Sequence, residues 1–358
     1  MARLTLLDPT RTAKPAQHLE TKLRRFVVGQ EEAIQEIVRT YQIHIAGLSP
    51  GGRPIGNFLF LGPTGSGKTR IVEAAAQALL NNPRSVIKID CAEFQHSHEI
   101  AKLIGSPPGY LGHRETHALL SQEGLNQYHT EKIKLSLVLF DEIEKASDAL
   151  WNLLLGILDK GVLTLGDNRK VDFSLSMVFL TSNLGAAEMS SLCEPRLGFH
   201  APVPETSALN EKRGAQMSRV GASAARRKFT PEFINRLDKL VVFRPLGRAE
   251  LCRIVDIELE MVQARIRNVA DKPFEFGITD SAREFLLTEG TDSRYGARHL
   301  KRAIERLIVS PLSNLIASGQ IQRNDRIRVS HREGSPTLMF STEAPAIVSS
   351  QVARRIAA

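Results

Sequence analysis

Short apolar runs alternate with longer amphipathic stretches over the first two thirds of the chain. The runs predict buried strands at Asn57–Leu61, Ser85–Asp90, Ser136–Phe140, Ser176–Thr181 and Val241–Phe243. Between them, stretches such as Arg70–Leu80 and Asp148–Leu158 carry apolar residues at helical spacing. Buried strands that alternate with helices are typical of an α/β fold, in which helices cover both faces of a parallel sheet.

The pattern changes after Pro245, where long amphipathic stretches predict a smaller, mainly helical domain. Its expected helices are Arg248–Arg267, Ser281–Leu287 and Ala297–Ile316, and a small hairpin is expected from Arg326–Ser330 and Thr337–Phe340. The weakly periodic stretch Gly185–Arg227 predicts a long, partly helical loop. The expected organisation is a polar lead-in (1–25), a large α/β domain (26–244), a small helical domain (245–340) and a flexible tail (341–358).

Composition narrows the class of protein without defining it. The hydrophobic fraction of 42% is normal for a globular protein, and no apolar run is long enough to cross a bilayer. The first residues lack the apolar core of a secretory signal, so we expect a soluble, cytoplasmic protein without a membrane partner. Cys91, Cys193 and Cys252 lie far apart without metal-ligand spacing, which argues against a zinc site or a disulfide framework.

A glycine-rich turn between a predicted strand and a predicted helix carries the first chemical signal. The sequence GPTGSGKT matches the phosphate-binding pattern G-x-x-x-x-G-K-[ST], and its residues are Gly62, Pro63, Thr64, Gly65, Ser66, Gly67, Lys68 and Thr69. Glycines allow successive N–H groups to point toward an anion, and the helix that follows adds its positive end. Lys68 is expected to reach the β- and γ-phosphates of ATP and Thr69 to bind Mg²⁺, with Arg70 beside them.

A pair of carboxylates forms the second half of the predicted site. Asp141 and Glu142 follow the very apolar strand Ser136–Phe140. Ligands of open α/β sheets bind at the carboxyl ends of the strands, which is where this pair falls. Asp141 is expected to bind Mg²⁺, and Glu142 to act as the general base that polarises the attacking water. Taken without the phosphate-binding turn, this acidic pair would fit the start of a helix as well as a catalytic site, because acids are common in the first turn of helices.

Together these segments resemble the Clp-type AAA+ ATPases, and most closely the C-terminal ATPase module of the ClpA, ClpB and ClpC unfoldases. The resemblance covers about Phe26–Val329 and rests on an ordered series of segments: VVGQEEAI, RPIGNFLFLGPTGSGKT, LIGSPPGYLG, LVLFDEIEKA, GDNRKVDF, TSNLG, FTPEFINRLDKLVVF and YGARHLKRAI. It implies an ATP-dependent homo-hexamer, that is, a motor that threads polypeptide substrates through a ring pore.

The resemblance also implies roles for further residues. Asn183 would hold the attacking water, Arg236 would reach the ATP of a neighbouring subunit, and Arg298 would contact the γ-phosphate from the small domain. A guanidinium suits such tasks because it is always charged. Val28 and Gly29 would lie against the adenine.

Tyr110 and Leu111, in the loop GSPPGYLG, correspond to the family's pore residues, which grip the substrate chain.

Two alternative functions stay open at this point. The tripeptide Leu197-Gly198-Phe199 fits the pattern by which relatives dock a Clp-type peptidase. The net charge of +8 leaves room for a nucleic-acid motor, although no base-stacking platform is evident and the charges are scattered. Between Gly112 and Leu137 the chain departs from the family pattern, and we expect a special interface or substrate-facing element there.

Overall fold

The computed structural model describes residue 8 and residues 10–106, 118–192, 207–269, 273–291 and 296–342. The chain divides into two compact units, Met1–Leu246 and Gly247–Ala358. None of the helices in these described ranges has a stretch both long and apolar enough to cross a lipid bilayer.

A parallel sheet of order β2-β3-β6-β1-β7 forms the centre of the first unit. Its strands are β1 (Gly56–Leu61), β2 (Ile87–Asp90), β3 (Ser136–Asp141), β6 (Ser176–Ser182) and β7 (Lys239–Val242). Every residue of β1 and β6 is buried, which explains why their central residues are all apolar rather than alternating with polar ones. The buried polar exceptions, Asn57, Ser176, Thr181 and Ser182, lie toward the strand ends. The predicted strand positions are therefore confirmed to within about two residues.

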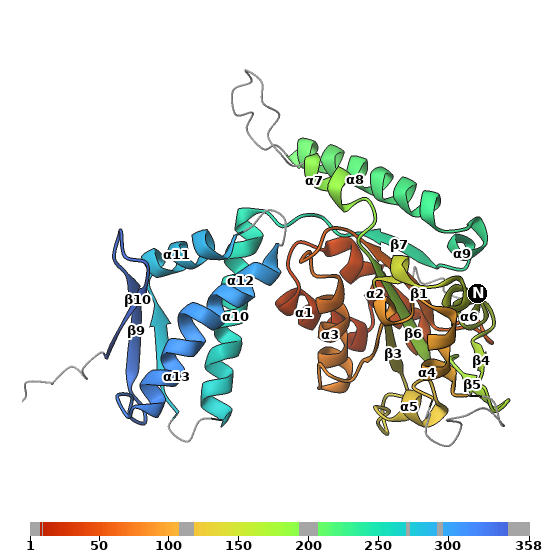
Figure 1. Ribbon diagram of the computed structural model, residues 1–358, viewed down its shortest axis with the longest axis horizontal. Helices are drawn as coiled ribbons and strands as arrows, with labels where there is room; N and C mark the ends of the chain where they lie inside the picture. The colour runs from red at the N-terminus through yellow and green to blue at the C-terminus, as the bar shows by residue number, and fades with distance from the viewer. Residues whose placement is uncertain are drawn as a thin grey trace, which may run out of the picture. The chain divides into compact units, whose positions relative to one another are not determined.

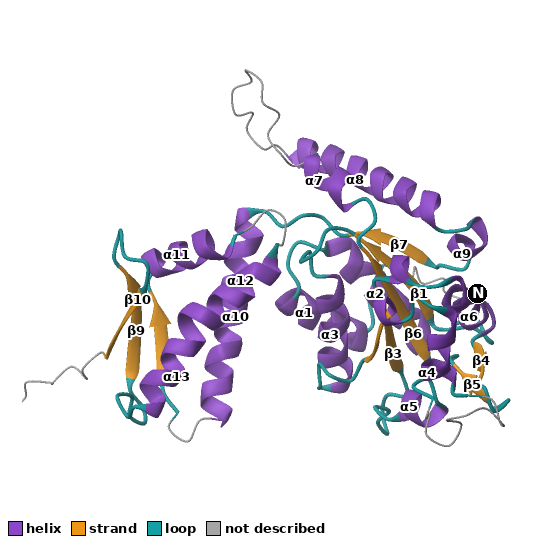
Figure 2. Cartoon of the chain, viewed as in Figure 1, coloured by secondary structure: helices purple, strands orange, loops and turns teal. Residues whose placement is uncertain are grey.

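Helices cover both faces of this sheet (Figure 2). The side chains of each central strand alternate between two cores. One core contains Phe58, Phe60 and Phe179 and packs against helices α1 (Lys14–Phe26), α2 (Glu31–Ile45) and α3 (Lys68–Leu80). The other contains Leu59, Phe140 and Leu180 and packs against α6 (Asp148–Lys160). The predicted α/β fold, with helices on both faces of a parallel sheet, is confirmed.

Two stretches differ from the expectation. The polar lead-in contains α1, whose Ala16, Leu19 and Leu23 are fully or almost fully buried, so this helix is part of the first unit's core beside α3 (Figure 1). The stretch Gly185–Arg227, expected as a long and partly helical loop, contains more helix than expected. Its second half forms α8 (Ser207–Lys228), after the short α7 (Ala186–Ser191). Alanine, serine and arginine dominate α8, so its hydrophobic pattern is weak although its helix propensity is good.

The remaining elements of the first unit are short. They are the helices α4 (Ala101–Ile104), α5 (Gln122–Asn126) and α9 (Pro231–Asn235), and a hairpin of β4 (Val162–Thr164) and β5 (Lys170–Asp172). Trp151 of α6 packs against Phe229 and Phe233, with ring centroids 4.9 and 5.4 Å away. This aromatic cluster fixes α9 and the residues that follow it.

The second unit combines helices with a small sheet of order β10-β9-β8. Its elements are α10 (Arg248–Val269), β8 (Glu275–Ile278), α11 (Asp280–Gly290), α12 (Ala297–Ile304), α13 (Ser310–Ala317), β9 (Arg326–His331) and β10 (Leu338–Thr342). The expected hairpin is confirmed as the antiparallel pair β9–β10. A π-helical turn, Glu305–Val309, joins α12 to α13 within the stretch expected as one helix.

Candidate nucleotide site

The turn between β1 and α3 has the backbone that an anion site requires. Gly62, Gly65 and Gly67 have φ angles of 146°, 76° and 101°, in the region that favours glycine. A Cβ on Gly62 would lie 2.6 Å from the carbonyl oxygen of Phe243, whereas a Cβ on Gly67 would meet nothing within 4 Å. Open space therefore lies in front of the first turn of α3, whose N–H groups and positive end favour a phosphate there.

Lys68 lies inside this turn and is only 8% exposed. Its Nζ donates to the carbonyl oxygens of Gly62 and Pro63 at 2.7 and 2.9 Å, and to Oδ1 of Asn183 at 2.9 Å. The structure thus joins the first residue of α3 to the asparagine that follows β6. Neutral oxygens hold the ammonium, and phosphate oxygens are stronger acceptors for it.

Asp141, the last residue of β3, is surrounded by donors. The hydroxyl of Thr181 donates a short hydrogen bond to Oδ1. The Thr69 hydroxyl lies 3.5 Å from Oδ2, and Nζ of Lys88 lies 3.1 Å from the same oxygen. A carboxylate beside a hydroxyl at the mouth of a phosphate turn offers the oxygen ligands that Mg²⁺ prefers.

Glu142 has a left-handed backbone, with φ of 58°, which is uncommon for a residue other than glycine. Its N–H donates to Oγ1 of Thr181 at 3.1 Å, and its Oε1 lies 3.4 Å from Nδ2 of Asn183. Nζ of Lys145 donates to its Oε2 at 2.5 Å, and this hydrogen bond raises the pKa of Lys145. The carboxylate that follows this uncommon backbone lies between Asn183 and Lys145.

These residues fit a nucleotide and a magnesium ion bound together. Within the described ranges, no group of three or more His, Cys, Asp or Glu residues could hold a metal ion by itself. Thr69 and Asp141 would then supply protein oxygens, and the phosphates would supply others. Arg70, which was expected beside the phosphates, lies 3.7 Å from Glu73 and also stacks near the ring of Phe26.

The segment expected to contact adenine is packed against the phosphate turn. Val28 is 6% exposed, and Gly29 has φ of 75°. Gln30 is buried, and its Nε2 donates to the carbonyl oxygens of Ser66 and Arg244, both at 3.0 Å. The N–H of Arg244 donates back to Oε1 of Gln30 at 3.1 Å. One glutamine thereby ties the start of α2 to the phosphate turn.

Arg236 lies at the opposite edge of the sheet. Its carbonyl oxygen accepts from Nδ2 of Asn57, the second residue of β1, whereas Lys68 follows the other end of that strand. The length of the strand separates the two edges by roughly 15 Å. The guanidinium contacts Glu232 at 3.0 Å and Asp159 at 3.6 Å. The structure therefore does not bring Arg236 to the phosphate turn of the same chain.

Other expected site residues fall outside this constellation. Tyr110, Leu111 and Leu197–Phe199 lie outside the described residues. The loop that leads to Tyr110 starts beside the β4–β5 turn, because the N–H of Gly166 donates to the carbonyl of Ile104 at 2.8 Å. Arg298 is exposed at the start of α12 in the second unit.

Comparison with known protein families identifies the larger unit. Residues 53–240 match the model described as AAA domain (Cdc48 subfamily). The chain belongs to the AAA domain family. Residues 246–329 match a second model, the C-terminal D2-small domain of ClpB protein. The expected resemblance to a Clp-type AAA+ module is confirmed, and the family is one of ATPases, which implies nucleotide use.

Individual relatives agree with the two family matches. The chain is 39% identical over 328 residues to the chaperone protein ClpB of Rhizobium meliloti (strain 1021), covering 92% of this chain and 35% of that protein. It is 39% identical over 305 residues to ClpB of Pseudomonas putida, covering 84% and 32%. The chain thus spans about a third of the length of the curated relatives it matches.

Two solved structures have a similar fold. The Saccharomyces cerevisiae Hsp104–casein complex in its extended conformation superposes with a TM-score of 0.74 and 31% identity, covering 92% of this chain and 53% of that one. The Hsp104–ADP complex gives the same TM-score and identity, covering 93% and 52%.

Four residues around the acidic pair were missed in the sequence: Lys88, Glu144, Lys145 and Thr181. Lys88 reaches Asp141 only because β2 pairs with β3. Thr181 lies beside Asp141 because β6 is the next strand. In the sequence, only their position could have indicated these residues, because each lies on or next to a strand that ends at the site.

Proposed function

We propose that this chain is an ATP-hydrolysing motor subunit that binds ATP with Mg²⁺ at Gly62–Thr69 and pulls on polypeptide chains. The observation that carries the proposal is the convergence of Lys68, Asn183 and Glu142 through direct contacts of 2.9 and 3.4 Å. These residues follow three different strands, and the contacts place a cation, an amide and a carboxylate at one edge of the sheet. A set of this kind serves phosphoryl transfer to water.

Each side chain has a definite task in this account. ATP with its metal supplies the reactive γ-phosphoryl group when bound. Lys68 holds the phosphate oxygens, Thr69 and Asp141 hold the ion, Glu142 takes a proton from the attacking water, and Asn183 orients that water. The bond from Lys68 to Asn183 sets the position of the amide before nucleotide arrives.

The position of Arg236 supports assembly into a ring. Because it lies at the sheet edge opposite its own phosphate turn, its guanidinium serves the nucleotide of a neighbouring subunit. A hexamer in the cytoplasm is the assembly we propose. Arg298 would act from the small domain, and Val28 and Gly29 would lie against the adenine.

The working end of the motor would be the loop that contains Tyr110 and Leu111. An aromatic ring flanked in the sequence by glycines offers apolar contact that tolerates any substrate sequence. We expect Tyr110→Ala to abolish unfolding of a labelled model protein, whereas Tyr110→Phe keeps it because the ring is retained. If the alanine variant unfolded the model protein at the wild-type rate, the proposed role of Tyr110 would be contradicted.

A peptidase partner is a second proposal, carried by Leu197–Phe199 in the connection between α7 and α8. Retention of a Clp-type peptidase on the immobilised protein, and its loss in Phe199→Ala, would support docking. Equal retention by both proteins would exclude this tripeptide as the docking element.

A further inference from the structure

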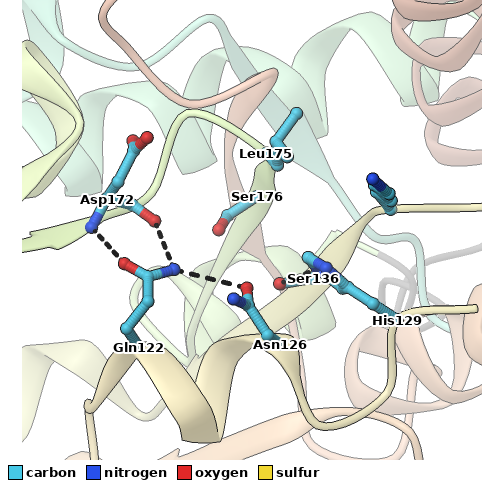
Figure 3. Close-up of a pocket in the computed structure, with 8 residues that line it drawn as sticks. Gln122, Asn126, His129, Ser136, Asp172, Leu175 and Ser176 are labelled. Carbon is cyan, nitrogen blue, oxygen red and sulfur yellow. Dashed lines mark hydrogen bonds between the residues drawn. The ribbon is translucent and has the colours of Figure 1, made fainter.

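A polar cavity of about 300 Å³ lies at the amino ends of β3 and β6 (Figure 3). Ser136 and Ser176, the first residues of these strands, pair in register on its wall. The same strands end at Asp141 and Ser182, next to the nucleotide site. The cavity is therefore at the opposite edge of the sheet and separate from the site described above.

The Ser176 hydroxyl is the feature of this cavity that needs an explanation. Ser176 is only 1% exposed, and its hydroxyl has no hydrogen-bond partner within the part of the chain that the structure describes. Figure 3 shows it directed into the space between Asp172 and Ser136. The hydroxyl faces the cavity rather than the closed core, so it is available to donate a hydrogen bond to a ligand.

Two neighbouring amides leave one further donor for a ligand. Oε1 of Gln122 accepts from the N–H of Asp172 at 2.8 Å, and its Nε2 donates to Oδ1 of Asn126 at 3.3 Å. These bonds fix which end of each amide carries the nitrogen. The Nδ2 group of Asn126 has no acceptor among the described residues and lines the cavity.

The cavity lining carries one cation, Lys134, and one carboxylate, Asp172, and the two differ in their contacts. Lys134 lines it and has no ion pair within the described ranges. The Asp172 carboxylate accepts from the N–H and hydroxyl of Ser174 at 2.7 and 3.0 Å, and Figure 3 shows it directed away from Gln122 and Asn126. The free polar groups of the wall are thus donors.

His129 provides a local reporter. The Ser136 hydroxyl donates to the carbonyl of Leu125 at 2.8 Å, so it accepts from Nε2–H of His129 at 2.9 Å. Burial and the charge of Lys134 lower the pKa of His129, which keeps the ring neutral at pH 7. An anion in the cavity would change the electrostatic environment of this ring.

We propose that this cavity binds a small oxyanion, a phosphoryl or carboxylate group, through the Ser176 hydroxyl, the Asn126 amide and the Lys134 ammonium. Its volume is at the lower end of the range for small-molecule sites, so the ligand is a small molecule rather than a folded partner. The site does not depend on the proposed motor function.

Nuclear magnetic resonance of ¹³C-labelled histidine rings tests the proposal on the full chain, with His129→Asn assigning the signal. Inorganic phosphate is titrated in one series and succinate in another, which separates phosphoryl from carboxylate recognition. Because the reporter is local, anion uptake at Gly62–Thr69 does not mimic the result. We expect a saturable shift of the His129 signal with one of the two anions.

Variants test the contacts. Ser176→Ala and Lys134→Met are each expected to weaken binding about tenfold or more, whereas Lys132→Met, a matched lysine that does not line the cavity, leaves it unchanged. Ser176→Ala removes an unpartnered group, so its melting temperature without anion should not fall below that of the wild type. Absence of a saturable shift with both anions, or unchanged affinity in both folded variants, would overturn the proposal.

Discussion

The hydroxyl of Thr181 donates to the carboxylate of Asp141, and the same oxygen accepts the N–H of Glu142 at 3.1 Å. One buried side chain on β6 thus holds both Asp141, the last residue of β3, and Glu142, which follows it. Thr181→Val keeps the shape and removes both bonds. We expect ATP hydrolysis to fall about tenfold, since each lost bond to a charged or buried group is worth about 1–3 kcal/mol. A phosphate-release assay at saturating ATP checks this, and Thr164→Val, on the β4–β5 hairpin, is the control.

Lys88 competes with a metal ion for Oδ2 of Asp141, because its Nζ lies 3.1 Å from that oxygen. Lys88→Met should therefore lower the Mg²⁺ concentration that gives half-maximal hydrolysis by roughly two- to fivefold, a modest effect because the lysine is half exposed and screened. A magnesium titration at fixed ATP measures this, with Lys102→Met as a matched surface control. An unchanged or higher magnesium requirement would contradict the competition.

Gln30 joins α2, the phosphate turn and Arg244 through hydrogen bonds of 3.0–3.1 Å. Gln30→Leu leaves buried backbone groups unpaired at about 1–3 kcal/mol each. A loss of about 2 kcal/mol lowers the melting temperature of a unit of this size by roughly 4–8 °C. Thermal unfolding followed by the single Trp151 measures the loss, and ATP affinity should fall with it. Gln35→Leu, on the same helix, should show neither change.

Stability should also depend on mildly acidic pH. Burial lowers the pKa of His44, and burial together with Lys134 lowers the pKa of His129. A histidine with a lowered pKa in the folded state binds its proton more readily when unfolded. Its stabilising contribution is therefore complete above the unfolded pKa near 6.5 and is lost as pH falls below that value. The melting temperature should drop between pH 7 and 5.5, and less so in His129→Gln. A pH-independent melting temperature would contradict this.

Arg236 gives a prediction about assembly. Subunits carrying Arg236→Ala should be inactive alone, and so should subunits carrying Lys68→Ala. Mixed together, they should regain part of the hydrolysis, because an intact Arg236 of one subunit then faces an intact phosphate turn of another. Arg53→Ala is the control, because it removes another guanidinium at this edge of the sheet, one that pairs with Asp238 at 2.6 Å. It tests whether loss of any positive charge there abolishes hydrolysis. No recovery in the mixture would argue against action between subunits.

How far the sequence predicts the fold depends on the strength of the local pattern. Buried strands such as Phe58–Leu61 are apolar at every position, so the sequence pattern alone indicates them. The strands β4 and β8 were missed because three or four alternating residues carry too little signal. Helix α8 was not located because its buried face is made mostly of small residues. Gly221, Ala224 and Ala225 are buried there beside Met217, and such a face gives only a weak hydrophobic pattern.

The site shows the same division. Lys68, Thr69, Asp141 and Glu142 belong to contiguous motifs, so their residue types and spacing indicate them. The roles of Thr181 and Lys88 depend on the strand order β2-β3-β6, which residue spacing does not encode. Pairing of Asp90 with Asp141 is what places Lys88 near that carboxylate.

The central claim is tested most directly by ATP hydrolysis of the purified protein, measured with and without an unfolded polypeptide such as casein, beside Glu142→Gln. The account predicts hydrolysis that the polypeptide stimulates, and loss of hydrolysis in the variant, whose amide cannot accept the proton of water. Hydrolysis that is indifferent to polypeptide but stimulated by DNA in a salt-sensitive way would contradict the proposed function and favour a nucleic-acid motor.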